Sequence, residues 1–410
     1  MLAEILESVQ SEAELKDALR ARKADLMPNH ITVDDIFATI NYMCGLIQGV
    51  GTGIALPLMF NITLEQVPAE KLGLMMGTAS LITAMAPAVG PSVGGFIVNH
   101  FGWRMIFVAL LPLLILSFIM GVTSIRQVSE TRKAPFQVLD YLFLAVGFAC
   151  FIFATSTASS TGWASLPVAA LFALSILCLA VFYYRCSHSK DPLIDVRVFH
   201  CLPFTLSVLV LVFIQFVCLG LGYLIPNYAQ LVSGENAFTA GCLLLPGCLL
   251  GAFLSPISGR LLDRFGAARP ILFGNVCIIF SLVCFTLFSG RLEILPCIGF
   301  YVFFALGQGC SVGNTMTNGL RQLSPALNAD GNAVINTLQQ LAGAIGTSVV
   351  TTIVAASQAS LPGDTALATQ QGSQEAFRLL AVITVLILIC SCSAFLLIRS
   401  RQQNFSYSNQ

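Results

Sequence analysis

The chain has 410 residues, of which 56% are hydrophobic and only 10% charged, and its mean hydropathy is +0.83. Soluble domains carry about 25% charged residues, so this composition excludes an ordinary water-soluble protein. Twenty basic side chains balance twenty acidic ones, so no excess charge points to nucleic acid as a partner. Long apolar runs between short charged stretches are typical of a protein that crosses the lipid bilayer many times.

The first 36 residues differ from the rest, because they hold twelve of the forty charged side chains. Leu2, Ile5 and Leu6 fall on one helical face, and Pro28 ends the pattern. Residues 1–36 are therefore interpreted as a charged amphipathic segment, either a solvated helix or a helix that binds a partner or dimerises. The segment lacks the basic and then apolar order of a secretory signal peptide.

Eleven apolar segments are long enough to cross a bilayer core of about 30 Å, which takes about 20 helical residues. They lie near residues 37–61, 73–97, 104–124, 140–158, 164–184, 204–229, 239–257, 268–289, 294–315, 332–356 and 376–398. The runs are continuous and not alternating, which excludes a β-barrel. The predicted fold is an all-α polytopic membrane protein, a bundle of about 11 transmembrane helices.

The basic residues between the spans predict the orientation. If the connection at 62–72 is cytoplasmic, thirteen lysines and arginines fall on that side and three on the other. The expected cytoplasmic segments are 62–72, 125–138, 186–200, 258–269 and the C-terminal tail. Eleven spans then leave residues 1–36 on the outside, although this segment carries four basic side chains of its own.

Small residues at regular spacing mark the second span. The pattern is Gly-x8-Ala-x3-Gly-Pro-x2-Gly-Gly, formed by Gly77, Ala86, Gly90, Pro91, Gly94 and Gly95. Glycines at such spacing let another helix backbone approach, and a proline bends the helix. Leucine at Gly90, Gly94 or Gly95 is therefore predicted to weaken helix packing and to lower the folded yield.

Two further motifs stand at the first span and between the seventh and eighth spans. The first is Gln48-Gly49-Val-Gly-Thr-Gly, and the second contains Gly259, Asp263, Arg264 and Gly266. Asp263 at a helix corner can face the positive N-terminal end of a neighbouring helix or an arginine, and the two glycines of the second motif allow tight turns. A contact that breaks between two conformations and a fixed topology anchor are equally open interpretations.

Together these motifs resemble the fourteen-helix drug:proton antiporter branch of the major facilitator superfamily. The small-residue run resembles its antiporter motif, and the Asp263 loop matches the second-half copy of its cytoplasmic loop motif. The resemblance covers about residues 36–400, with the eleven spans matching helices four to fourteen. It implies a multi-pass transporter of the inner or plasma membrane that exports small amphipathic compounds by alternating access, with protons as coupling ion and no cofactor.

The resemblance also implies a domain order. Residues 37–124 would be the remainder of the N-terminal helix bundle, followed by a central two-helix linker region. The predicted divisions are 1–36, 37–124, 125–200, 201–400 for the C-terminal helix bundle, and 401–410 for the cytoplasmic tail.

Two departures from the family pattern predict weak coupling. Gly45 stands where the family has an arginine implicated in proton coupling, and the first three helices have no counterpart before Ile36. We therefore expect little proton-coupled efflux from this chain, and Gly45→Arg should improve it. The alternative is a truncated, transport-incompetent relative that persists as a remnant or acts as a binding or regulatory membrane protein.

Polar residues inside the spans suggest which side chains line a cavity. No acidic residue lies in mid-span, and Asp140 and Asp330 fall at span ends, where ordinary solvation would explain them. Asn336 and Gln340 share a helical face and are predicted to line a cavity, as are Tyr228 and Gln230. Tyr223 and Tyr301 are further aromatic faces for a cationic drug.

No constellation of residues supports an enzyme. The four histidines are scattered, no Cys-x-x-Cys pair occurs, and no Ser/His/Asp arrangement emerges, so neither a metal site nor catalysis is expected. Ten cysteines inside apolar runs, Cys218 and Cys248 among them, are interpreted as small hydrophobic residues.

Overall fold

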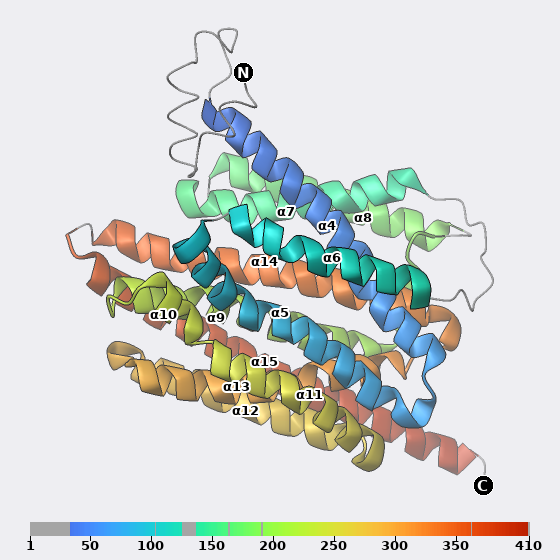
Figure 1. Ribbon diagram of the computed structural model, residues 1–410. Helices are drawn as coiled ribbons and strands as arrows, with labels where there is room; N and C mark the ends of the chain where they lie inside the picture. Colours follow the sequence, from blue (N-terminus) through green and yellow to red (C-terminus); the bar gives the residue numbers. More distant parts are fainter. Residues whose placement is uncertain are drawn as a thin grey trace. The chain divides into compact units, whose positions relative to one another are not determined.

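The computed structural model describes residues 33–102, 104–124, 137–162, 165–189, 192–361 and 363–408. The interpretations of residues 1–32 and of the loop at 125–136 lie outside the described residues. Gly45, Pro91 and Gly95 lie in helices, but their side-chain surroundings also lie outside the description. The described part of the chain is built of helices without a β-strand, so the all-α prediction is confirmed (Figure 1).

Twelve α-helices and four short 3-10 helices make up the described chain. The α-helices are α4 (Val33–Gln66), α5 (Leu72–Phe101), α6 (Arg104–Ser124), α7 (Val138–Thr161), α8 (Leu166–His188), α9 (Leu202–Leu231), α10 (Ala237–Cys242), α11 (Leu245–Phe265), α12 (Ala268–Phe288), α13 (Ile294–Leu320), α14 (Asn328–Ser360) and α15 (Thr365–Ser408). The 3-10 helices are η1 (Ala69–Lys71), η2 (Val196–His200), η3 (Ser289–Arg291) and η4 (Pro325–Leu327).

Nine segments of the described chain are long and apolar enough to cross a membrane. The apolar parts of α5 and α6 are shorter, at Leu72–Met85 and Val108–Thr123. Most apolar side chains of α6 are exposed, Phe118 to 72%. Such a surface is suited to lipid and not to water.

One expected span is divided. The segment predicted at 239–257 is two helices, because a turn separates α10 from α11 between Cys242 and Leu245. Pro246 occupies the first turn of α11, where its missing N–H costs no helical hydrogen bond. The other observed helices extend beyond several predicted ends, and α15 is 44 residues long.

The chain divides into two compact units. Of the described residues, the first contains those within 33–58 and 92–124, and the second contains 59–91 and those from 137 onward. In the second unit α13 packs against α9, α11 and α12, while α9 also packs against α14 and α15 (Figure 1). Its core includes the fully buried side chains Phe204, Phe285, Phe304 and Phe377.

Glycines bring several helices of the second unit into backbone contact. A Cβ added at Gly309 would lie 2.2 Å from the carbonyl oxygen of Gly251, and one at Gly346 would lie 2.3 Å from that of Phe216. Lipid is as apolar as leucine, so membrane helices associate largely through such close packing. The small-residue packing expected of a membrane bundle is therefore present on α11, α13 and α14.

The predicted cytoplasmic connections meet at one end of the second unit. Asp263 at the end of α11 contacts the start of α5 and Arg321 at the end of α13. At the other end the Tyr228 hydroxyl donates to the carbonyl of Ser289, and Gln370 donates to that of Gly290. Connections that the basic residues assign to one side thus lie together, while the side of the membrane that they face stays a prediction.

Sidedness in the cell is testable by cysteine labelling. In a variant without native thiols, Arg264→Cys should stay unmodified when intact cells meet a membrane-impermeant maleimide, whereas Gly363→Cys should react. Both positions are exposed, so a difference in their rates reports the side of the membrane. Rapid labelling of the cysteine at position 264 would overturn the orientation.

Candidate functional site

Asp263 caps the N-terminus of helix α5. Its Oδ1 accepts the backbone N–H of Gly73 at 3.0 Å, and its Oδ2 accepts that of Leu74 at 3.0 Å. These donors belong to the first turn of α5, which begins at Leu72, and they have no partner within the helix. A carboxylate at this point also faces the positive end of the helix dipole, which it stabilises.

The same carboxylate forms an ion pair. The Nη2 atom of Arg321 lies 3.0 Å from Oδ1 of Asp263, and the Asp263 side chain is only 11% exposed. The sequence offered a helix N-terminus or an arginine as the partner of Asp263, and both are present. This part of the prediction is confirmed by the contacts.

Glycines allow the two helices to meet at this point. Gly73 and Gly77 are one helical turn apart on α5 and face Ser255 and Gly259 on α11. A Cβ at Gly259 would lie 2.1 Å from the carbonyl oxygen of Gly73, and one at Gly77 would lie 2.5 Å from that of Ser255. Any side chain at these positions would push α5 off α11 and separate Asp263 from its donors.

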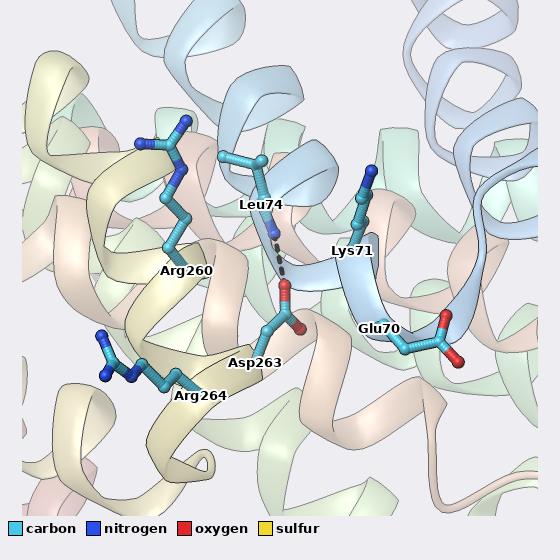
Figure 2. Close-up of a pocket in the computed structure, with 6 residues that line it drawn as sticks. All are labelled: Glu70, Lys71, Leu74, Arg260, Asp263 and Arg264. Carbon is cyan, nitrogen blue, oxygen red and sulfur yellow. Dashed lines mark hydrogen bonds between the residues drawn. The ribbon is translucent and has the colours of Figure 1, made fainter.

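A polar cavity of about 270 Å³ lies beside this contact. Figure 2 shows Asp263 pointing toward Leu74, whereas the side chain of Arg264 extends away from it. The lining residues are Glu70, Lys71, Leu74, Arg260, Asp263 and Arg264. Three cationic side chains, Lys71, Arg260 and Arg264, thus lie beside the Asp263 contact, at the end predicted to be cytoplasmic.

The other residues of the loop motif have separate roles. Gly266 ends α11 with a φ of +83°, which glycine adopts without strain, so the predicted tight turn is present there. Gly259 lies inside α11, and the prediction that it forms a turn is wrong, because it is needed for helix approach instead. The guanidinium of Arg264 lies 5.3 Å from the centre of the Phe265 ring.

The small-residue motif is only partly explained by packing. Gly77 is in close contact, as predicted, but no atom of the described chain would lie within 4 Å of a Cβ at Gly90 or Gly94. The predicted packing loss at these two positions therefore stays a prediction, whereas the close approach seen among the described residues lies in the first two turns of α5. No described atom would lie within 4 Å of a Cβ at Gly49 either, and Gln48 beside it is exposed.

The residues predicted to line a cavity do not lie together in the structure. Tyr228 is buried, with its hydroxyl on Ser289, and Gln230 is exposed and donates to the carbonyl of Pro226 one turn before it. Tyr301 is also buried, with its hydroxyl 3.2 Å from the sulfur of Cys248. Tyr228 and Tyr301 therefore act as packing residues in this conformation.

Asn336 belongs to a chain of amides that the sequence did not reveal. Its Nδ2 donates to Oδ1 of Asn332 at 2.7 Å, and Nδ2 of Asn332 donates to Oδ1 of Asn61 at 2.7 Å. Asn332 is fully buried, whereas Gln340, predicted on the same face as Asn336, is exposed. Asn61 and Asn332 are 271 residues apart, so only the fold brings them together.

Other buried amides in the second unit are satisfied by neighbouring helices. Asn275 of α12 bonds to Ser391 and Ser311, and Asn314 of α13 donates to Ser258 at 2.6 Å. Gln308 donates to the sulfur of Cys218 at 3.2 Å, so this thiol has a polar partner as well as apolar neighbours. These contacts favour helix packing as the role of these amides.

Asp140 differs most from its prediction. Its side chain is fully buried and forms an ion pair with Arg185, which joins α7 to α8, while its Oδ2 has no hydrogen-bond partner among the described residues. Ordinary solvation at a span end is therefore the wrong explanation. The sequence signal was present, since an aspartate and an arginine lie at the adjoining ends of two consecutive spans.

Loss of Arg185 should destabilise this helical hairpin. Breaking a fully buried pair costs about 3–5 kcal/mol, and the 39% exposure of Arg185 reduces this to about 1–3 kcal/mol. Arg185→Gln should lower the thermal unfolding temperature in detergent, and Asp140→Asn in the same chain should recover part of the loss. An Arg185→Gln protein as stable as the wild type would show that the buried carboxylate needs no cation.

A second ion pair lies before helix α9. Asp195 accepts the Nε of Arg197 at 2.9 Å and its backbone N–H at 3.0 Å, and these contacts hold the pKa of the Asp195 carboxyl below its usual value. Asp195 also caps the short helix η2 in the connection from α8 to α9.

These features define a class of protein: a helical membrane bundle whose distant segments are joined at one end by a capped helix and ion pairs. The family model described as Major Facilitator Superfamily matches residues 37–347. The chain belongs to this superfamily of membrane transporters, as its motifs predicted. It is an integral, multi-pass membrane protein of the cell membrane.

Similar curated proteins carry drug-resistance names. The chain is 35% identical to the lincomycin resistance protein LmrB of Listeria monocytogenes over 84% of its own length and 75% of that protein. It is equally identical to the protein of that name in Bacillus subtilis, over 84% and 74%. It is 27% identical to the multidrug resistance protein B homolog of Mycobacterium tuberculosis, over 75% and 58%. The resemblance to the drug-efflux branch is therefore confirmed.

Proposed function

We propose that this protein exports small amphipathic compounds from the cell by alternating access. The observation that carries the mechanism is the Asp263 contact, in which one carboxylate joins α5, α11 and Arg321 of α13. Asp263 and its backbone donors are 190 and 189 residues apart, so the contact links distant parts of the chain.

The contact has the properties of a latch between two conformations. It consists of hydrogen bonds and an ion pair at the end of the bundle, and water can replace each of these when the helices part. Beside this contact, Gly73, Gly77 and Gly259 bring the backbones of α5 and α11 together without interlocking side chains. We infer that the latch holds the predicted cytoplasmic end closed and breaks when this end opens.

Lincomycin-like compounds are the first substrates to test, because two of the relatives are named for resistance to lincomycin. The chain should be expressed in a susceptible bacterium that lacks its own drug exporters. Resistance to lincomycin and retention of a cationic dye are then measured. Cells that do not express the protein are the inactive control. Equal susceptibility with and without the wild-type protein, at matched amounts in the membrane, would contradict the proposal.

Protons are the coupling ion that the resemblance implies. Asp140 is the least exposed acidic side chain among the described residues, which makes it the first acid to test. Dye efflux from energised cells should be compared with and without a protonophore, in the wild type and in Asp140→Asn. Robust protonophore-sensitive efflux would overturn the weak coupling predicted from Gly45, and its loss in the variant would assign the proton to Asp140.

We propose that side chains of α14 line the substrate cavity. Asn332 and Asn336 form a polar stripe with Asn61 in an otherwise apolar region, and polar residues inside membrane helices mark substrate pathways. Gln340 continues the stripe on its exposed side. Asn336→Leu should alter the relative resistance to different drugs more than the folded yield.

A further inference from the structure

A second cavity, of about 280 Å³, lies in a groove on the outside of α11 and α12. Leu261, Phe265 and Phe273 on its walls are exposed, Phe273 to 60%, whereas Cys310 at its base is buried. Leu254 extends the groove along α11. From Leu254 to Phe265 the helix rises about 16 Å, so the groove is elongated along the helix axis.

Positive charge is concentrated at one end of this groove. Arg269 lines the cavity, and its guanidinium lies 5.7 Å from the centre of the Phe265 ring, while that of Arg264 lies 5.3 Å from the same ring. Neither arginine has an ion-pair partner among the described residues, and no acidic side chain lines the cavity. Asp263, the nearest acid in sequence, is turned toward α5 instead.

The position in the helices matches the level of a membrane surface. Arg269 is the second residue of α12 and Arg264 the last but one of α11, so both stand where the apolar spans begin. Leu254 and Phe273 lie farther along the spans, where the bilayer is apolar. The groove therefore presents the Arg269 cation at headgroup depth and an apolar wall beneath it.

We propose that this groove binds one anionic phospholipid, with its phosphate on Arg269 and an acyl chain along Leu254, Leu261 and Phe273. The apolar wall suits an acyl chain. Arg269, which forms no ion pair with a described residue, selects a headgroup with net negative charge over a zwitterionic one. The cavity holds part of one chain and not a whole lipid. This site is separate from the proposed export function and does not depend on it.

Native mass spectrometry of the full chain tests the headgroup selection. Protein released from mixed micelles with equal phosphatidylglycerol and phosphatidylcholine should retain phosphatidylglycerol preferentially. Arg269→Gln should reduce this preference about fivefold, the usual contribution of one basic side chain at a membrane surface. Arg269→Lys should keep part of it. The matched control is Arg399→Gln, which removes an exposed arginine of α15 that does not line the groove.

Quenching by brominated lipid tests the acyl chain, independently of any arginine variant. Phe273→Trp, in a chain with Trp103 and Trp163 replaced by phenylalanine, should be quenched more by brominated phosphatidylglycerol than by the brominated choline lipid. The proposal is overturned by equal quenching, by no quenching, by an unchanged lipid preference in Arg269→Gln, or by an equal loss in Arg399→Gln.

Discussion

Asp263→Asn should reduce drug export about tenfold or more while the protein still inserts and folds. The amide keeps one acceptor for the first turn of α5 but loses the charge that interacts with the helix dipole and with Arg321. Hydrogen bonds to a charged group contribute about 1.5–3 kcal/mol, and about 1.4 kcal/mol changes a conformational equilibrium tenfold. The measurements are drug resistance and the rate at which Leu72→Cys, at a position that is buried in this structure, reacts with a maleimide. This rate should rise when the latch is weakened.

Two comparisons separate the latch from a general effect of charge. Asp364→Asn makes the same change at an exposed helix cap, where Asp364 accepts only the N–H of Leu367, and asparagine caps equally well. It should leave export unchanged. Arg321→Gln removes one of the three contacts of Asp263 and should have a smaller effect than Asp263→Asn. Full export by Asp263→Asn would reduce the contact to a topology anchor.

Gly259→Ala should lower the folded yield and the unfolding temperature. The added methyl group would lie 2.1 Å from the carbonyl oxygen of Gly73, and a backbone atom cannot move aside as a flexible side chain does. Overpacking of this kind costs about 1–3 kcal/mol. Size-exclusion chromatography and thermal unfolding in detergent measure the loss, and Gly73→Ala should reproduce it, with its Cβ at 2.6 Å from the Gly259 oxygen.

Gly299→Ala is the matched control for this substitution. Gly299 lies inside α13 and no described atom would be within 4 Å of its Cβ, so alanine should be neutral or raise helix stability by up to about 1 kcal/mol. If Gly259→Ala is as stable as Gly299→Ala, then α5 does not pack on α11 as described, and the Asp263 latch loses its geometric basis.

The sequence alone was enough to predict the class of protein, because the signals involved are local. Span length, apolar composition and the bias of basic residues depend on neighbours in the chain and on the bilayer, not on tertiary contacts. The Asp263 loop was also recognisable, since its aspartate, arginine and glycines lie within eight residues. A Gly-x3-Gly pattern at Gly73 and Gly77 was available too, and would have indicated the start of α5 as the packing face.

The tertiary structure decided which of these residues meet. Asp263 bonds to Gly73, Leu74 and Arg321, and Asn332 bonds to Asn61. These partners lie up to 271 residues apart in the chain. Gly77 and Gly90 are both glycines of α5. Among the described atoms, a neighbouring backbone lies close to Gly77 and none lies close to Gly90. Asp140 is at a span end like other acids, but its burial follows from the packing of α7 on α8. The periodicity of small or apolar residues identifies which face of a helix packs. Which residue that face contacts depends on how two helices cross, and the sequence of one segment does not determine the crossing.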